Sequence, residues 1–507
     1  MSTDPLNRSR LLVTSLRSAL AREVGADVPL IETHISWVLL AGEHAYKIKK
    51  PVRLSFLDFS TLAARRHFCD EELRLNRRFA PLLYLRVLPI TGDENAPHLG
   101  GVGEPIEYAL QMQRMRDDDL AGARLARGAL DAADLERFAA TLVDWHRNAP
   151  QAAADGAWGT PRRVAADIDG VLAAWPAADD ADAIGDLRRW FDAQGDDTAE
   201  QVAGRLAAGH VRECHGDLHV DNLAFVDGKL IAFDCLEFDP ALRWIDTVSE
   251  VAFLAMDLQA RQRHDLAHAF VNAYLEGSGD AAGLPLLRRY AVYRALVRAR
   301  VARLRDPAGS VRGAAAGYLR LAQRLARQWD PRLLVTHGLP GSGKTWVTRD
   351  LLGVTGAIRW RSDVERRRML GSGHYQASDS EVVYARLREL ARLSLRCGYP
   401  TIVDAACLRR AERDALRALA AEMQVPCVLL HCDAPPDVLR QRVHERAARG
   451  SDASEADDAV LQKLGGWIEP LAPDEQRLAI RVDTSQPLSA APLAARWLAA
   501  TRAGPPS

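Results

Sequence analysis

The stretch of sequence that decides the fold runs from His215 to Asn222 and reads HGDLHVDN. Within it, Asp217 precedes Asn222 in one loop, and a second acid, Asp234, follows shortly afterwards. Phosphoryl transfer needs a carboxylate that orients or deprotonates the attacking hydroxyl, and oxygen ligands that hold Mg²⁺ on the phosphates. We expect Asp217 to act as the catalytic base, and Asn222 and Asp234 to bind the metal.

A predicted β-hairpin connects these residues. Two apolar runs, 223–226 and 230–233, flank the turn residues Asp227 and Gly228. Such a turn between two short apolar strands is typical of a hairpin. It would return Asp234 to the neighbourhood of Asn222.

Length and composition limit the class of protein. The 507 residues are too many for one hydrophobic core, so two or three domains are expected. Hydrophobic residues make up 48% and charged residues 26%, which is ordinary for a globular protein. The net charge of −1 gives no bulk electrostatic reason to expect binding to nucleic acid or an anionic membrane.

Cysteine spacing and hydropathy indicate a cytoplasmic protein. The seven cysteines are scattered and contain no C-x-x-C pair, so buried reduced thiols are expected rather than a zinc site or a disulfide framework. The segment 1–10 is polar, and no apolar run reaches the length of a membrane span. We therefore expect a soluble protein with no membrane partner.

A lysine strand and a glutamate helix precede the loop. Strand-like runs at 31–40 and 45–49 place Lys47 and Lys49 on one face of the second strand. Lys47 is the better candidate to hold ATP phosphates, although lysines on an edge strand are commonly solvated. The helix predicted at 60–79 offers Glu72, with Glu71 in reserve, as the partner of that lysine.

Several other residues have more than one interpretation. The Ala- and Asp-rich segment 151–209 is either a solvated helical insertion or an acidic wall for a cationic substrate. Asp246 is a helix N-cap, a residue that orients the catalytic loop, or both. Glu237, close to the metal acid, is a candidate metal ligand or substrate contact.

The Lys strand, Glu helix, H-G-D-x-H-x-x-N loop and later Asp resemble the aminoglycoside phosphotransferase and choline kinase group, over about residues 30–325. That resemblance implies a two-lobed, protein-kinase-like α+β fold and the roles given above for Lys47, Asp217, Asn222 and Asp234. Cys235 follows the metal acid where protein kinases have the Phe of D-F-G, and no activation-loop signature follows. A small alcohol is therefore expected as acceptor rather than a protein.

A second phosphate-binding motif begins after a new apolar strand at 333–336. It fits G-x-x-x-x-G-K-[ST] and consists of Gly338, Leu339, Pro340, Gly341, Ser342, Gly343, Lys344 and Thr345. Backbone N–H groups of such a loop wrap the phosphates of ATP, and the helix after it adds a favourable dipole. We expect Lys344 to contact the β- and γ-phosphates and Thr345 to bind Mg²⁺.

Acids and arginines complete the predicted second site. Asp363 and Asp404 each follow an apolar strand, where α/β sheets place ligands, although ordinary strand-end acids are common. Asp363 would activate the acceptor and Asp404 would hold Mg²⁺ or its water. Arg446 and Arg449 lie on a helix that either forms a lid over ATP or is simply a solvated basic helix.

This second half, about residues 332–500, resembles small α/β P-loop kinases with a parallel sheet, in the group that contains polynucleotide kinase, zeta toxin and gluconate-kinase-like enzymes. Together the halves resemble the bacterial two-domain bifunctional aminoglycoside phosphotransferase/ATP-binding proteins. The resemblance implies a kinase domain at 1–328, with an N-lobe at about 28–115 and a helical C-lobe at about 116–328, and a P-loop domain at 332–507.

We expect an ATP-dependent kinase that phosphorylates a hydroxyl of an amino sugar, a sugar or an amino alcohol, with a second ATP site. A competing hypothesis is an ATP-sensing regulatory protein in which one domain binds ATP without transfer. The second domain could also act like polynucleotide kinase or zeta toxin, or the protein could be a plain NTPase.

Overall fold

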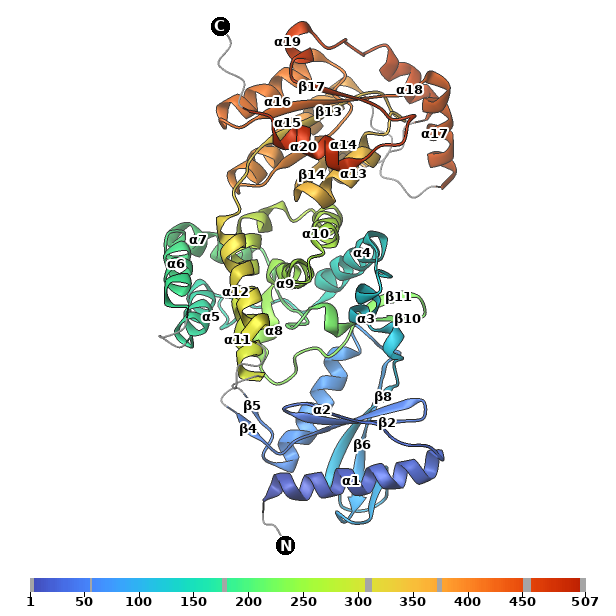
Figure 1. The fold of residues 1–507 in the computed structure, drawn as a ribbon, viewed down its shortest axis with the longest axis vertical. Coiled ribbons are helices and arrows are strands. Elements are labelled where there is room, and N and C mark those ends of the chain that lie inside the picture. Colours follow the sequence, from blue (N-terminus) through green and yellow to red (C-terminus); the bar gives the residue numbers. More distant parts are fainter. Residues whose placement is uncertain are drawn as a thin grey trace. The chain divides into compact units, whose positions relative to one another are not determined.

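The computed structural model describes residues 4–54, 57–175, 180–305, 312–371, 376–449 and 457–501 (Figure 1). The chain divides into two compact units. The first contains Met1–Ala166 and Val202–Leu254, and the second contains Asp167–Gln201 and Ala255–Ser507. The helices α10 to α12 of the predicted first domain thus belong to the same unit as the P-loop fold.

The first unit begins with an antiparallel sheet in the order β1-β2-β3-β8-β6-β7. Helix α1 (Pro5–Val24) buries Leu12 and Leu16 against Trp37 and Ile48 of this sheet. Helix α2 (Leu62–Asn76), capped by the Thr61 hydroxyl, carries the predicted glutamates. The strands are β1 (Leu30–Glu32), β2 (Ser36–Ala41), β3 (His44–Lys49), β6 (Tyr84–Gly92), β7 (Pro97–Leu99) and β8 (Glu107–Gln113). A separate small hairpin pairs β4 (Arg53–Leu54) with β5 (Leu57–Asp58).

The predicted catalytic loop, residues 215–222, lies in the helical part of the first unit. The predicted hairpin is confirmed: β10 (Leu223–Val226) pairs with β11 (Lys229–Ala232), and the Phe233 N–H donates to the Asn222 carbonyl over 3.0 Å. The strand β9 (Val211–Glu213) before the loop pairs with β12 (Trp244–Asp246) after it. The surrounding elements are η1 (Asp117–Asp119), α3 (Ala121–Ala126), α4 (Ala132–Asn148), η2 (Val220–Asn222), α8 (Pro240–Arg243) and α9 (Thr247–Ala260).

The Ala- and Asp-rich segment forms helices, and its two interpretations, a solvated insertion and an acidic wall, both stay predictions. Its helices are α5 (Pro161–Ala173), α6 (Ala181–Asp192) and α7 (Gly195–Ala207). The helices α10 (His264–Ser278), α11 (Leu284–Arg305) and α12 (Arg312–Arg327) follow, with the short η3 (Ala281–Gly283) between the first two. Helices α11 and α12 run side by side (Figure 1).

The P-loop fold has a parallel sheet in the order β14-β15-β13-β16-β17. Its core buries Leu334 of β13, Leu351 of α13 and Trp497 of α20. The strands are β13 (Leu333–His337), β14 (Ile358–Arg361), β15 (Thr401–Asp404), β16 (Cys427–Asp433) and β17 (Ala479–Asp483). The helices are α13 (Lys344–Thr355), α14 (Ser362–Leu370), α15 (Ala377–Arg396), α16 (Arg410–Glu422), α17 (Pro436–Arg449), α18 (Asp458–Gly465), α19 (Pro473–Gln476) and α20 (Ala490–Leu498).

These two architectures confirm the predicted fold class. A kinase-like N-terminal fold with an antiparallel N-lobe sheet is followed by a P-loop fold with a parallel sheet. Among the described residues, no helix has both the length and the apolar character needed to cross a bilayer.

Candidate functional site

The first candidate site gathers around Lys47 on β3. Its Nζ donates to Glu72 Oε1 of α2 over 2.7 Å and to Asp234 Oδ1 over 2.6 Å. The strand lysine, the helix glutamate and the predicted metal ligand Asp234 are therefore in contact, and the glutamate that meets Lys47 is Glu72 rather than Glu71. Asp234 adopts φ 60°, in the left-handed region that non-glycine residues enter infrequently and Asp more often than most. Its N–H donates to the Tyr84 hydroxyl over 3.0 Å, which helps to hold that backbone.

A second lysine, Lys49, is buried beside Lys47 and extends this ion cluster. Lys49 Nζ donates to Glu72 Oε2 over 2.7 Å and also to the Glu237 carboxylate. All three side chains are buried. Burial alone would raise the pKa of Glu72, but the two lysines lower it to about 2. Glu237 is thus committed to Lys49, and it is a structural partner of the lysine pair rather than the metal ligand or substrate contact considered from the sequence.

This cluster gives a stability prediction. Lys49→Met is expected to lower the free energy of unfolding by about 3–5 kcal/mol, because it leaves the buried Glu72 and Glu237 carboxylates short of a counter-charge. Urea unfolding measures the loss. Lys229→Met is the control, since Lys229 is an exposed lysine of β11, and its cost should be no more than about 1 kcal/mol. Equal losses in both variants would contradict the account.

The catalytic loop holds Asp217 with its side chain 38% exposed. Asn222 Nδ2 donates to the Asp217 carbonyl over 2.9 Å and to its carboxylate over 3.2 Å, and His219 Nε2 lies 3.4 Å from the same carboxylate. His215 joins the two acidic segments, because its Nε2 bonds the Phe233 carbonyl at 2.8 Å and its Nδ1 accepts from the Asp217 N–H. Burial lowers the pKa of His215, so the ring is neutral.

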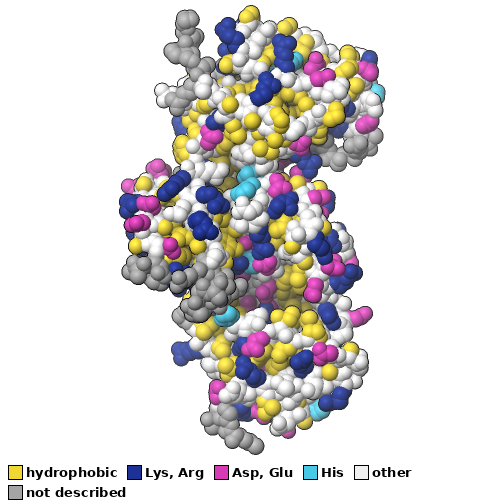
Figure 2. Space-filling model, in the orientation of Figure 1, with side chains coloured by type: hydrophobic (Ala, Val, Ile, Leu, Met, Phe, Trp, Pro, Cys, Tyr) yellow, Lys and Arg dark blue, Asp and Glu magenta, His cyan; other side chains and the backbone are white. Residues whose placement is uncertain are grey.

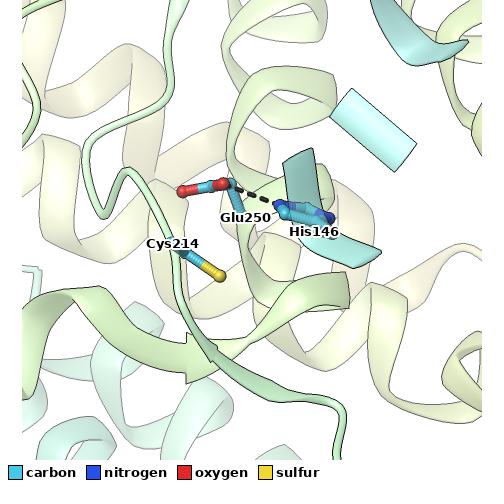
Figure 3. A group of neighbouring side chains, drawn as sticks. All are labelled: His146, Cys214 and Glu250. Carbon is cyan, nitrogen blue, oxygen red and sulfur yellow. Dashed lines mark hydrogen bonds and ion pairs between the residues drawn. The ribbon is translucent and has the colours of Figure 1, made fainter. Parts of the chain in front are cut away.

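Glu250 of α9 positions the loop from the helix beside it (Figure 3). Its Oε1 accepts from the Gly216 N–H over 2.8 Å, and its Oε2 pairs with His146 Nε2 over 2.8 Å. Gly216 has φ +86°, and a Cβ there would come within 2.8 Å of the Leu242 carbonyl. Cys214 completes a group of three buried metal-type ligands, but both carboxylate oxygens of Glu250 are already hydrogen-bonded within the protein. The group therefore needs no metal to be satisfied.

Asp246 behaves as the sequence suggested in one respect only. Its Oδ1 accepts from the Val248 N–H over 3.0 Å, which caps α9, and it forms a bidentate ion pair with Arg205. The carboxylate that contacts the backbone of the catalytic loop is Glu250, one helical turn further along. The sequence did contain a signal for Glu250, an acidic residue four positions after the helix cap, but the sequence analysis missed it.

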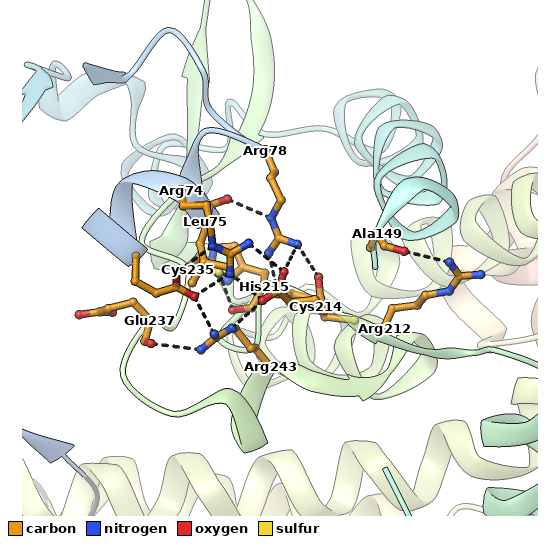
Figure 4. Close-up of polar contacts among 12 residues, drawn as sticks. Arg74, Leu75, Arg78, Ala149, Arg212, Cys214, His215, Cys235, Glu237 and Arg243 are labelled. Carbon is orange, nitrogen blue, oxygen red and sulfur yellow. Dashed lines mark hydrogen bonds and ion pairs between the residues drawn. The ribbon is translucent and has the colours of Figure 1, made fainter. Parts of the chain in front are cut away.

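An ion-pair network joins α2 to the same loop (Figure 4). Arg74 of α2 and Arg78, which follows that helix, reach the Glu213 carboxylate at 2.8 and 3.1 Å, immediately before the loop. Arg243 bridges Glu213 and Glu71 at 3.2 and 2.8 Å. Glu71, the reserve candidate for the lysine, thus belongs to this network. The network fixes the helix that carries Glu72 relative to Asp217.

The second candidate site is an open pocket at the carboxyl edge of the parallel sheet. Lys344, Thr345, Asp363 and Asp404 all line it, with Pro340, Gly341 and Gly343 of the predicted motif. The loop glycines Gly338, Gly341 and Gly343 all have positive φ. A Cβ at Gly343 would come within 3.0 Å of Thr484, so only glycine lets this turn close as it does. Ser342 is buried, and Leu339 contributes a carbonyl that accepts from Lys344 Nζ over 2.8 Å.

The predicted acids occupy the expected strand ends. Asp404 ends β15, and its Oδ2 accepts from the Thr348 hydroxyl over 3.2 Å. Asp363 lies in the first turn of α14, directly after β14, and pairs with Arg366 at 2.6 Å. Burial lowers the pKa of Lys344 in spite of the nearby Asp404 charge. This donor set, a P-loop with a lysine, a threonine and two acids, fits nucleotide phosphates and Mg²⁺.

The arginines of α17 differ from one another. Arg446 lines the pocket, as predicted for a lid residue, whereas the side chain of Arg449 lies outside the described residues. Arg442 of the same helix also lines the pocket. It donates to the carbonyl groups of Gly341 and Thr484 over 3.2 and 2.7 Å. It therefore clamps the P-loop to the segment after β17.

Comparison with known proteins identifies relatives along most of the chain. The uncharacterized protein Rv2004c of Mycobacterium tuberculosis and the uncharacterized protein Mb2027c of Mycobacterium bovis are each 33% identical over 463 residues, 87% of this chain and 91% of theirs. The chain belongs to their family. In addition, residues 333–471 match the AAA domain family AAA_33.

Different solved structures resemble different parts of this chain. A sugar kinase from a Janibacter species is 26% identical, with a TM-score of 0.27, over 33% of this chain and 94% of that chain. A choline/ethanolamine kinase family protein from Mesorhizobium loti is 14% identical, with a TM-score of 0.39, over 62% of this chain and 95% of that chain.

Two histidines that contact each other, His337 and His431, lie next to the P-loop, and His337 directly precedes Gly338. His337 Nδ1 and His431 Nδ1, on the neighbouring strands β13 and β16, are 2.7 Å apart, so one ring must donate and the other accept. His337 is buried, and burial together with the nearby His431 lowers its pKa to about 3. Both rings are therefore neutral near pH 7.

This pair predicts an acid-sensitive stability. Because the pKa of His337 is lower in the folded than in the unfolded chain, its contribution is complete above about pH 6.5 and is lost as the pH falls toward 3. Between pH 7 and pH 5 we expect His337 to cost the folded protein about 2 kcal/mol. Urea unfolding at both pH values should show this difference in the wild type and a smaller one in His337→Asn. An unchanged pH difference in the variant would contradict the assignment.

Proposed function

We propose that this protein is an ATP-dependent phosphotransferase that phosphorylates a hydroxyl group of a small polar molecule at the site around Asp217. The observation that carries the proposal is the double contact of Lys47 Nζ with Glu72 and Asp234, beside the loop that holds Asp217 and Asn222. Bound ATP with Mg²⁺ supplies the phosphoryl group and neutralises its charge.

The side chains divide this work among them. Lys47, positioned by Glu72, holds the phosphates, and Asn222 and Asp234 hold the metal. Asp217 accepts the proton of the acceptor hydroxyl, and Asn222 Nδ2 and His219 orient its carboxylate. The Glu250–Gly216 contact and the network around Glu213 keep this loop in place before substrate arrives.

A small acceptor suits the segment that follows Asp234. Cys235 and Glu237 are buried, the first bonded to Asn76 and the second to Lys49, and α8 begins at Pro240. This short, anchored connection replaces the long loop with which protein kinases hold a polypeptide. Amino sugars, sugars and amino alcohols are the classes we propose to test.

The P-loop pocket supports a second transferase site in the same chain. It presents Asp363, with its side chain 27% exposed, to the same space as Lys344 and Asp404. An acid open to an acceptor favours phosphoryl transfer over an ATP-sensing domain that binds without transfer. On the face shown in Figure 2, basic and acidic side chains are interspersed, which does not favour a nucleic-acid acceptor of the polynucleotide kinase kind.

A reducing compartment such as the cytoplasm fits the cysteines. All seven are free thiols, five of them buried.

An acceptor screen tests the proposal. The full-length protein is incubated with ATP, Mg²⁺ and one compound at a time from the three classes, and ADP release is followed. We expect at least one compound to stimulate ADP release above the rate in water. An ATP loss that no compound changes would instead indicate a plain NTPase.

A further inference from the structure

Helix α10 packs against the P-loop fold within the second compact unit (Figure 1). Asn272 of α10 donates from Nδ2 to the Ala357 carbonyl over 2.9 Å and accepts at Oδ1 from the Arg359 N–H over 2.8 Å. The Asn272 amide thus makes the two backbone hydrogen bonds that a neighbouring strand would make, and these fix the start of β14. His268 Nδ1 adds a contact of 3.3 Å to the Gly353 carbonyl.

Glu276, one turn further along α10, holds two arginines of β14. Its Oε1 accepts from Arg361 over 2.8 Å, and its Oε2 lies 3.6 Å from Arg359. The arginine side chains are only 11% and 9% exposed, whereas that of Glu276 is 29% exposed. Glu276 is therefore a charge partner shared by two guanidinium groups that have little access to water, a setting in which losing a partner charge is costly.

Both arginines reach the nucleotide site. Arg359 donates to the carbonyl of Thr345, the last residue of the P-loop motif, over 3.2 Å, and to the Thr348 hydroxyl over 3.3 Å. Thr348 in turn donates to Asp404 over 3.2 Å. Arg361 lines the pocket and is followed directly by Ser362 and Asp363. Glu276 is thus connected to Thr345 through Arg359, and to Asp363 through Arg361 and the backbone that follows it.

We propose that Glu276 is a positioning residue for the P-loop nucleotide site, so that a helix from outside the P-loop fold sets the affinity of that site for ATP. Without the carboxylate, Arg359 and Arg361 lose the charge that they share and repel each other, so both side chains are expected to shift. The Thr345 carbonyl and the acidic end of the pocket then lose their fixed geometry. This inference rests on the proposed function, because it assumes that the P-loop site binds ATP.

Calorimetry on the full-length protein tests the inference, with a non-hydrolysable ATP analogue and Mg²⁺ as the probe. The site that disappears in Lys344→Ala is the P-loop site. Glu276→Gln is expected to weaken binding at that site by about fivefold to tenfold and to leave the other site unchanged. Glu389→Gln, the same chemical change at an exposed residue of α15, is the matched control and should leave both affinities within about twofold.

A double-mutant cycle separates positioning from general destabilisation. If Glu276 acts through Arg359, the variant Glu276→Gln/Arg359→Gln should bind little more weakly than Arg359→Gln alone. Unchanged affinity in Glu276→Gln, or effects of the two substitutions that simply add, would overturn the inference while the P-loop site remains. A wild-type protein with no Lys344-dependent site would overturn the proposed second site itself.

Discussion

Asp217→Asn, introduced into full-length protein that also carries Lys344→Ala, is expected to lower acceptor-dependent ADP release by about a thousandfold. The amide keeps the shape of the side chain and its contact with Asn222 but cannot accept the proton of the hydroxyl. Nucleotide affinity at the first site should stay within about threefold, because Lys47, Asn222 and Asp234 are unchanged. ADP release with an acceptor found in the screen, together with calorimetry, measures both quantities.

Asp221→Asn is the matched control for this prediction. Asp221 lies in the same loop with its side chain 52% exposed, so its loss should change the rate by no more than about twofold. The Lys344→Ala background removes turnover at the second site from the measurement. A rate that survives Asp217→Asn would show that the base is another group, and it would remove the central residue of the proposed first site.

Lys344→Ala alone is expected to abolish one of two nucleotide-binding sites. Lys344 is the lysine of the P-loop motif and lines the pocket, and the loss of a charged hydrogen-bond donor to phosphate weakens binding by about tenfold to a hundredfold or more. Calorimetry with the non-hydrolysable analogue should therefore give two sites in the wild type and one in the variant. The remaining affinity should match that of the site around Lys47.

Lys229→Ala serves as the control for the lysine substitution, since Lys229 is an exposed residue of the β10–β11 hairpin. It should retain both sites with unchanged affinities. A single site in the wild type would contradict the two-site account directly. Two sites that both survive Lys344→Ala would show that the second nucleotide does not bind at the P-loop.

Local motifs were the part of this protein that could be predicted from its sequence. The loop at 215–222, the hairpin after it and the P-loop are short contiguous segments whose turn residues and strand patterns determine their conformation, and each lies where expected. The alternation of β3 also placed Lys47 and Lys49 on one face, which allowed one helix to meet both.

Ion pairs between residues far apart in the chain could not be predicted from the sequence. The residues around Glu237 in the sequence do not indicate that it pairs with Lys49. In the same way, Glu250 contacts His146 and Gly216, which lie on elements far from it in the chain. Such choices depend on how whole elements pack, and a single sequence carries no direct record of them. The partnership of Glu276 with β14 belongs to the same class, because the sequence placed the two in different domains.

Mass spectrometry of the acceptor tests the central claim most directly, since it observes the transferred group itself. Wild-type protein and Lys344→Ala are each incubated with ATP, Mg²⁺ and the compound that stimulates ADP release, and so is the Asp217→Asn variant in the Lys344→Ala background. The account predicts an acceptor that gains one phosphoryl group with the first two proteins and remains unmodified with the third. Free phosphate as the sole product, or a phosphorylated acceptor that forms equally well without Asp217, would contradict it.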